Sequence, residues 1–219
     1  MNKDWSDKNK EFQKLVSREV TFKDGIRVLL ELRDLLFEQI SQIVNDFSED
    51  AFWQMPFAGA DGYHSKTLAY SIWHVFRIED IVLHTLILKD VQILESGAWQ
   101  EKIGADIVTT GNELIGRQIA DFSKKLDVQA LYEYAKAVKE STDEYLKALD
   151  FVSLKKKFSD SDRNRILTCG GVSSDENAVW LIDYWCGKNV AGLLKMPFSR
   201  HWIMHIEAML RIKNKLLIK

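Results

Sequence analysis

The sequence has few of the residues that interrupt helices or cross-link chains. Its 219 residues include 2 prolines, 11 glycines and 2 cysteines. So little proline and glycine excludes a collagen-like chain or a proline-rich disordered one, and it favours helix. The two cysteines, Cys169 and Cys186, are too few for a disulfide framework. We therefore expect free thiols and a reducing, cytoplasmic location.

The sequence also lacks a strong excess of charge and a long apolar run. It has 30 basic and 32 acidic residues, for a net charge of −2. Without a basic field, we expect no nucleic-acid partner. No apolar run approaches the roughly 18 residues that a membrane-spanning helix needs, so we expect no membrane partner. The charged first residues do not resemble a signal peptide.

Apolar residues are instead plentiful, and they recur at the period of amphipathic helices. They make up 46% of the chain, which is enough for a sizeable core. Spacings of three and four positions predict long helices over residues 22–45, 67–89, 128–150 and 197–215. Thr67 is the expected N-cap of the second of these helices. Four long helices with additional short ones predict an all-α fold, a four-helix bundle with long crossover connections.

The segments between these helices are less regular. A brief helix is expected near residues 114–122, a polar loop over residues 155–174 and a further helix over residues 175–194. Pro197 should end that helix and begin the last one. Residues 1–20 are predicted to be a peripheral lead, and residues 21–219 a single domain. In the lead, the apolar side chains that can dock on the domain are Trp5, Phe12, Leu15 and Val16.

Three histidines are candidate metal ligands. His201 and His205 are four positions apart on a predicted helix, so both rings lie over one patch of its surface. His74 begins an apolar stripe on a second helix. If the two stripes face each other, three imidazoles converge and leave coordination positions open, as in catalytic zinc sites. The alternative is three separate core-edge histidines, each bonded to a carbonyl or a carboxylate.

The other two histidines fit a metal site less well. His84 lies about 80° around the helix from His74, which makes it a poor fourth ligand, and we interpret it as a surface or interface residue. His64 precedes the helix, and we expect it to be a solvated loop residue.

Two carboxylates follow His74 on its helix, but they do not share its face. Glu79 lies about 140° and Asp80 about 120° away around the axis. We predict that both are helix-surface carboxylates or partners of Arg77, unless one of them orients an imidazole from another helix.

Large aromatic residues near the histidines can either wall a cavity or fill the core. The candidates are Trp73, Phe76, Trp185 and Trp202. Cys169 has no evident activating partner, so we interpret it as a free loop thiol.

Two short motifs resemble those of a known family. Residues 71–80, SIWHVFRIED, resemble the first metal-binding helix of the DinB-like superfamily, and residues 200–205, RHWIMH, look like its second signature. These small bacterial metalloproteins are related to the YfiT bacillithiol transferases and to the mycothiol-dependent maleylpyruvate isomerases. The turn at Met55 and Pro56 and the stretch TGNE at residues 110–113 are similar to the family pattern. The likeness extends over residues 22–215.

The resemblance implies a fold, a cofactor and an activity. It implies a four-helix bundle in which His74, His201 and His205 bind one divalent ion, nickel or zinc, and in which two copies form a homodimer. It suggests a thiol S-transferase that joins a low-molecular-weight thiol to an electrophilic small-molecule substrate. A metal-dependent hydrolase and a non-catalytic metal-binding bundle that acts in protein interaction remain the alternatives. The helix at residues 175–194 is longer than a minimal member needs, so the substrate does not follow from the resemblance.

Overall fold

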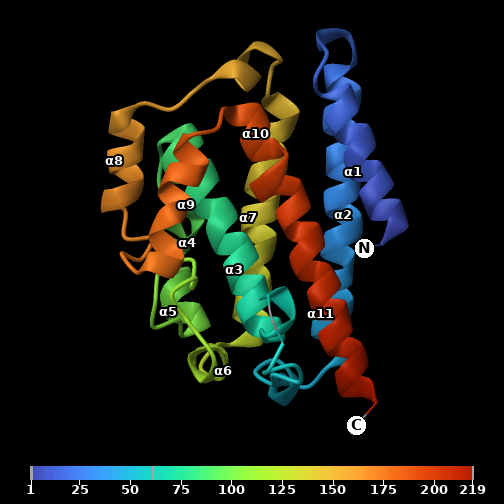
Figure 1. The fold of residues 1–219 in the computed structure, drawn as a ribbon, viewed down its shortest axis with the longest axis vertical. Helices are drawn as coiled ribbons and strands as arrows, with labels where there is room; N and C mark the ends of the chain where they lie inside the picture. Colours follow the sequence, from blue (N-terminus) through green and yellow to red (C-terminus); the bar gives the residue numbers. More distant parts are fainter. Residues whose placement is uncertain (1, 61, 219) are drawn as a thin grey trace.

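The described part of the chain is helical. A computed structural model describes residues 2–60 and 62–218 (Figure 1). Within these ranges it contains no strand, and its only bridge of β type is an isolated antiparallel one between Lys157 and Asn189. The predicted all-α class is therefore confirmed.

Four long helices pack side by side in the centre of the molecule (Figure 1). They are α2 (Phe22–Asp46), α3 (Leu68–Asp80), α7 (Val128–Ala148) and α11 (His201–Leu217). Helix α3 contacts α7 and α11, and α2 contacts the same two helices. Each long helix thus has two neighbours among the other three, and their apolar faces enclose a common core.

The ends of α3 show how the sequence sets its length. The hydroxyl of Thr67 accepts a hydrogen bond from the backbone N–H of Tyr70, so Thr67 is the N-cap that the sequence predicted. After Asp80 the helix continues as a π-helical segment, Ile81–Leu88, and it ends where Lys89 adopts a left-handed conformation with φ of 66°. The predicted end near residue 89 is confirmed. The change from α to π geometry was not predicted, because the spacing of the apolar residues does not reveal it.

The core contains large side chains from all four long helices. Its fully buried members include Leu36, Trp73, Phe76, Tyr134, Trp202 and Ile206. Burying an apolar side chain of this size contributes about 2–3 kcal/mol relative to leaving it in water. The packing of the four helices against one another therefore rests mainly on this shared core.

Shorter helices occupy the two long connections between the long ones. Those between α3 and α7 are α4 (Ile93–Ser96), α5 (Trp99–Ile103) and α6 (Arg117–Ser123), and those between α7 and α11 are α8 (Asp160–Thr168), α9 (Glu176–Cys186) and α10 (Val190–Leu194). The brief helix expected near residues 114–122 corresponds to α6.

The loop predicted over residues 155–174 is wrong in its middle, where α8 forms. Ser159 and Asp162 make a capping box, in which each side chain accepts a hydrogen bond from the backbone N–H of the other residue. The polar run that looked like a turn is thus the start signal of a helix.

The single helix predicted over residues 175–194 is also corrected, because it is divided into α9 and α10. Asn189 stops the chain from continuing as one helix, since its side chain accepts a hydrogen bond from the N–H of Gly192 and caps α10. Pro197 then lies in the first turn of a π-helical segment, Met196–Arg200, that leads directly into α11. The predicted restart at this proline is confirmed.

The first residues form a helix that lies along α2. In α1 (Lys3–Leu15) and just after it, Trp5, Phe12 and Val16 are buried, and Leu15 is partly buried. Gly25 of α2 allows this close approach, because a Cβ atom there would lie 2.6 Å from the backbone nitrogen of Val16. The apolar side chains of the lead therefore dock as expected.

None of the helices in the described ranges combines the length and the apolar character that crossing a membrane requires.

Candidate metal centre

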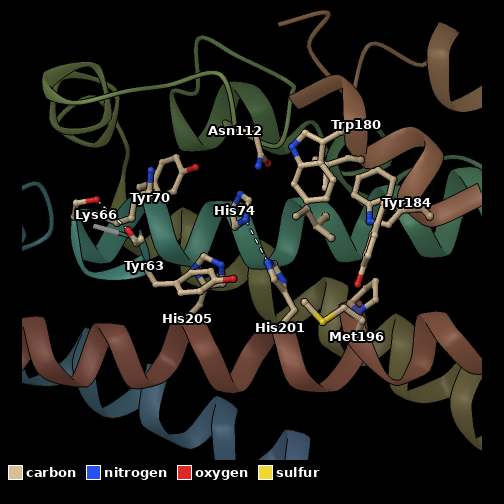
Figure 2. Close-up of a pocket in the computed structure, with 16 residues that line it drawn as sticks. Tyr63, Lys66, Tyr70, His74, Asn112, Trp180, Tyr184, Met196, His201 and His205 are labelled. Atoms are coloured by element: carbon tan, nitrogen blue, oxygen red, sulfur yellow. Dashed lines mark hydrogen bonds between the residues drawn. The ribbon is translucent and has the colours of Figure 1, made fainter. Parts of the chain in front are cut away.

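The three candidate histidines lie together between α3 and α11 (Figure 2). One ring nitrogen from each of His74, His201 and His205 lies within 4.8 Å of the others, and all three residues are buried. The Nε2 atoms of His74 and His201 are 3.2 Å apart. The predicted convergence of imidazoles from two distant stretches of the chain is confirmed.

Helix geometry explains this arrangement. His201 and His205 are one turn apart on α11, and their ring centroids are 4.5 Å apart. The ring of His74, on the facing helix α3, lies 5.1 Å from the ring of His201 and 4.7 Å from that of His205. The three rings thus form a compact triangle across the helix interface.

A backbone carbonyl orients His74. Its Nδ1 donates a hydrogen bond to the carbonyl oxygen of Thr110 across 2.9 Å, because a carbonyl can only accept. The proton is therefore on Nδ1, and the lone pair of Nε2 points toward the other two rings. Metal-ligating histidines almost always donate their second nitrogen in this way.

The loop that supplies this carbonyl is itself fixed. The N–H of Thr110 donates to the carbonyl of Gly171, and the hydroxyl of Tyr70 donates to the carbonyl of Gly111 across 3.0 Å. Gly111 has a φ of 78°, a conformation that favours glycine. The His74 ring is thus held from a segment 36 residues away.

The other two histidines have ring nitrogens without hydrogen-bond partners among the described residues. These buried atoms are Nδ1 of His201 and both nitrogens of His205. An unpartnered polar atom in an apolar interior costs free energy, and the great majority of such atoms are satisfied. The alternative of separate core-edge histidines bonded to carbonyls or carboxylates does not fit His205, whereas a cation at the centre of the triangle would use a lone pair from each ring.

Burial keeps the three imidazoles neutral. It lowers the pKa of His74 to about 4, although the hydrogen bond to Thr110 works in the opposite direction. Burial also lowers the pKa of His201 and His205 well below the ordinary value, and the neighbouring histidines lower them further. Neutral imidazole is the form that binds a metal, so at neutral pH the three rings are in the protonation state that a metal ligand needs.

All three histidines line one cavity, of about 440 Å³. Tyr63, Lys66 and Tyr70 lie at one end of it, and Trp180 and Tyr184 lie at the other (Figure 2). This volume is in the range of small-molecule sites. A ligand in the cavity would therefore contact the histidines directly.

The walls of this cavity are mostly not the aromatic residues that the sequence suggested. Of the four candidates, only Trp185 lines it, and the other three, Trp73, Phe76 and Trp202, fill the core. The cavity is also lined by four aromatic residues that no sequence pattern indicated as its walls, namely Tyr63, Tyr70, Trp180 and Tyr184. Residues 110–113, which resemble part of the family pattern, supply the acceptor for His74 and a further wall residue, Asn112.

The two carboxylates after His74 are buried, so their interpretation as surface groups is wrong. Glu79 pairs with both terminal nitrogens of Arg33, at 2.7 and 2.9 Å, and not with Arg77. Asp80 does pair with Arg77, at 3.1 Å, and it also accepts a hydrogen bond from Tyr134. Neither carboxylate has a hydrogen bond to a histidine ring of the site. They hold helices together instead.

His84 and His64 lie outside the histidine triangle, as expected. His84 is not a surface residue, however, because it is buried between Asp90, 2.7 Å from its Nδ1, and Ser141, 3.1 Å from its Nε2. His64 lies in the short turn Gly62–His64, partly exposed and hydrogen-bonded with Arg211. The cysteines Cys169 and Cys186 are free thiols, as expected.

The chain matches no family model, and none of the curated proteins matches it.

Proposed function

We propose that this chain is a metalloprotein of the DinB-like kind that binds one divalent transition metal ion, nickel or zinc, through His74, His201 and His205. The observation that carries the proposal is the buried triangle of neutral imidazoles, in which both nitrogens of His205 have no other partner among the described residues. In this proposal α2, α3, α7 and α11 are the four-helix bundle of that superfamily. The shorter helices then belong to its long crossover connections.

The donor set fits such an ion. Imidazole nitrogen suits zinc and nickel, and His74 already has the tautomer and the backbone acceptor of a metal ligand. Structural zinc sites usually have four protein ligands, whereas catalytic sites have three and an open position. Three histidines that all line a cavity therefore support a site that also receives a small molecule.

A bound divalent ion would supply positive charge that lowers the pKa of a water or a thiol that reaches it. The residues around it favour the thiol. Metal-dependent hydrolases such as the zinc proteases use a nearby carboxylate as general base, and none of the described residues that line this cavity is acidic. Glu79 and Asp80 are occupied by Arg33 and Arg77.

We therefore propose transfer of a low-molecular-weight thiol to an electrophilic small molecule. In this reaction the S–H bond of the thiol breaks, and its proton passes to water. The sulfur then forms a bond to the electrophilic carbon, and the leaving group departs with its electron pair. The chain would contribute the binding surface, and Trp180, Tyr184 and Trp185 would keep water away from the sulfur.

The test is a transfer assay with zinc- and nickel-loaded protein. Glutathione, cysteine or bacillithiol is mixed with the electrophile monochlorobimane, and product fluorescence is followed. We expect the loaded protein to exceed the uncatalysed rate, and the variant His201→Asn to fall to that rate. His84→Asn is the matched control, because it removes a buried histidine outside the triangle, and it should keep the activity. Equal activity in the His201→Asn variant would reject the proposal.

The oligomeric state and the partners of the chain are also part of the proposal. We propose that the chain forms a homodimer, as the resemblance implies, and that its only other partners are small molecules. Sedimentation equilibrium would measure the mass in solution, for which a dimer predicts twice the 25.4 kDa of one chain. A mass of one chain at micromolar concentration would contradict this part and leave the metal site unaffected.

A further inference from the structure

The cavity has a single lysine at one end. Lys66 is half-buried, and its Nζ lies 5.0 Å from the ring centre of Tyr70. Among the described residues, no acidic group lies within ion-pair distance of this ammonium group. Burial lowers the pKa of Lys66, and its charge is one of the causes that lower the pKa of His74 and of His205. The ammonium group thus acts on the histidine triangle, and none of the carboxylates in residues 2–60 and 62–218 pairs with it.

The polar surface near the triangle favours a negative ligand. Apart from Lys66 and the histidines, the described residues that line the cavity are uncharged. The side chain of Asn112 lies beside His74 in the cavity (Figure 2). Its amide oxygen already accepts a hydrogen bond from the hydroxyl of Thr110 across 2.8 Å. Its NH2 group is therefore the part that can donate to a ligand. Burial raises the pKa of Tyr70, and Glu113 lies close enough to raise it further, but Glu113 does not line the cavity. A cavity whose described lining has one cationic side chain and no acidic one favours an anion.

The opposite end of the cavity is apolar and aromatic. Helix α9 contributes Trp180, Tyr184 and Trp185, and Met196 and Pro197 continue this wall. Trp180 is 50% exposed, although its ring packs edge-on against Tyr184 at 5.7 Å. An indole that is half in water at the mouth of a cavity is a surface on which an apolar group can pack. Figure 2 shows this wall on one side of the histidines and Lys66 on the other.

We propose that the ligand of this cavity is an organic carboxylate with an aromatic or alkyl body. Its carboxylate binds at Lys66, its body packs against Trp180 and Tyr184, and its middle part faces the three histidines and Asn112. The inference rests on the proposed function, since it names the substrate class of that same site: the electrophile carries a negative charge at one end. A polar end, an apolar end and the histidines between them fix the direction in which such a molecule enters.

The test compares two probes that share one phenylbutyl body and differ in the end group, which is a charged carboxylate in one and a neutral hydroxyl in the other. The carboxylate 4-phenylbutanoate and the alcohol 4-phenylbutan-1-ol are titrated calorimetrically into zinc-treated protein at low ionic strength. We expect the carboxylate to bind at least about tenfold more tightly, because an ammonium–carboxylate hydrogen bond is stronger than one to a neutral hydroxyl. The variant Lys66→Met should remove this difference, and Lys66→Arg should keep most of it.

A second lysine provides a matched control. The Nζ of Lys188 lies 4.1 Å from the ring centre of Tyr184, but Lys188 does not line the cavity. The variant Lys188→Met should therefore leave the ratio of the two dissociation constants unchanged. Trp180→Ala should weaken both probes by a similar factor, since it removes part of the surface for the phenyl group.

The outcomes separate this inference from the metal proposal. Equal binding of the two probes by the unaltered protein would overturn the inference, and so would a charge preference that survives in Lys66→Met. Metal content is measured on the same samples by mass spectrometry. A protein that holds no zinc but still prefers the carboxylate through Lys66 would reject the metal proposal and support the carboxylate site.

Discussion

The indole N–H of Trp202 donates a hydrogen bond to the carboxylate of Glu79 across 2.8 Å, inside the core. Trp202 follows His201 on α11, and Glu79 lies five positions after His74 on α3. The same carboxylate pairs with Arg33 of α2, whose Nε is 2.6 Å from Asp143 of α7. One buried network therefore joins all four long helices next to the histidine triangle, and it fixes the position of α11 relative to α3.

Removing the charge of Glu79 should destabilise the protein strongly. In Glu79→Gln the guanidinium group of Arg33 loses its bidentate partner in a fully buried position. We expect the free energy of unfolding to fall by about 3–5 kcal/mol, the usual cost of breaking a buried ion pair. Urea denaturation measures this loss. Asp183→Asn is the control, because it breaks the exposed pair with Arg163 and should cost less than about 1 kcal/mol. Similar losses in the two variants would contradict the importance of the network.

Distorting the loop that orients His74 should weaken metal binding. In Gly111→Ala the new Cβ would lie 3.0 Å from the ring of Tyr70, at a φ of 78°. Because the neighbouring carbonyl of Thr110 accepts the hydrogen bond of His74, we expect the dissociation constant for zinc to rise about 10- to 100-fold. A competition assay with a chromophoric chelator measures it.

Gly104→Ala is a closely matched control for that variant. Gly104 has a φ of 74°, and its Cβ would also have a 3.0 Å contact, but it lies at the end of α5. Both variants should lose about 1–3 kcal/mol of stability through backbone strain. Only Gly111→Ala should change zinc affinity, and equal affinities would show that the loop does not position His74.

The metal-free protein should lose stability in mild acid. Burial lowers the pKa of His74 to about 4 from an ordinary value of 6.5, so between these two values the unfolded chain binds more protons than the folded one. The stability that comes from keeping His74 neutral is therefore fully present above about pH 6.5, and it is lost as the pH decreases toward 4. His74 alone should account for a loss on the order of 3 kcal/mol. His201 and His205 act in the same direction.

Urea denaturation across this pH range, after removal of metal with a chelator, tests the prediction. The variant His74→Asn should show a shallower dependence on pH, since it lacks one of the three buried groups. A free energy of unfolding that stays constant from pH 6.5 to 4 would mean that the imidazoles are not held neutral by burial.

The sequence predicts the elements that carry the histidines because their signals are local. The apolar period and the Thr67 cap fix α3, and the four-residue spacing of His201 and His205 fixes their common face on α11. The convergence with His74 needed the further assumption that the two apolar stripes meet. The structure supports that assumption.

What the sequence did not predict depends on contacts between distant segments. The carbonyl of Thr110 carries no residue-type signal, since every residue has one, and only the folded loop brings it to His74. Glu79 resembled a surface carboxylate because its partner Arg33 is 46 positions away. The capping box at Ser159 and Asp162 was the exception. Its signal is local, but a run of serine and aspartate is also typical of a turn, so the composition alone favoured a loop.

The most direct test of the metal site counts the metal in the purified protein. Inductively coupled plasma mass spectrometry is applied to the unaltered protein, to the single variants His74→Asn, His201→Asn and His205→Asn, and to His84→Asn, each after dialysis against zinc or nickel and then buffer. A site formed by the three histidines predicts one ion per chain in the unaltered protein and in His84→Asn, and no stoichiometric metal in the other three. One ion per chain retained in all three triangle variants, or none in the unaltered protein, would contradict it.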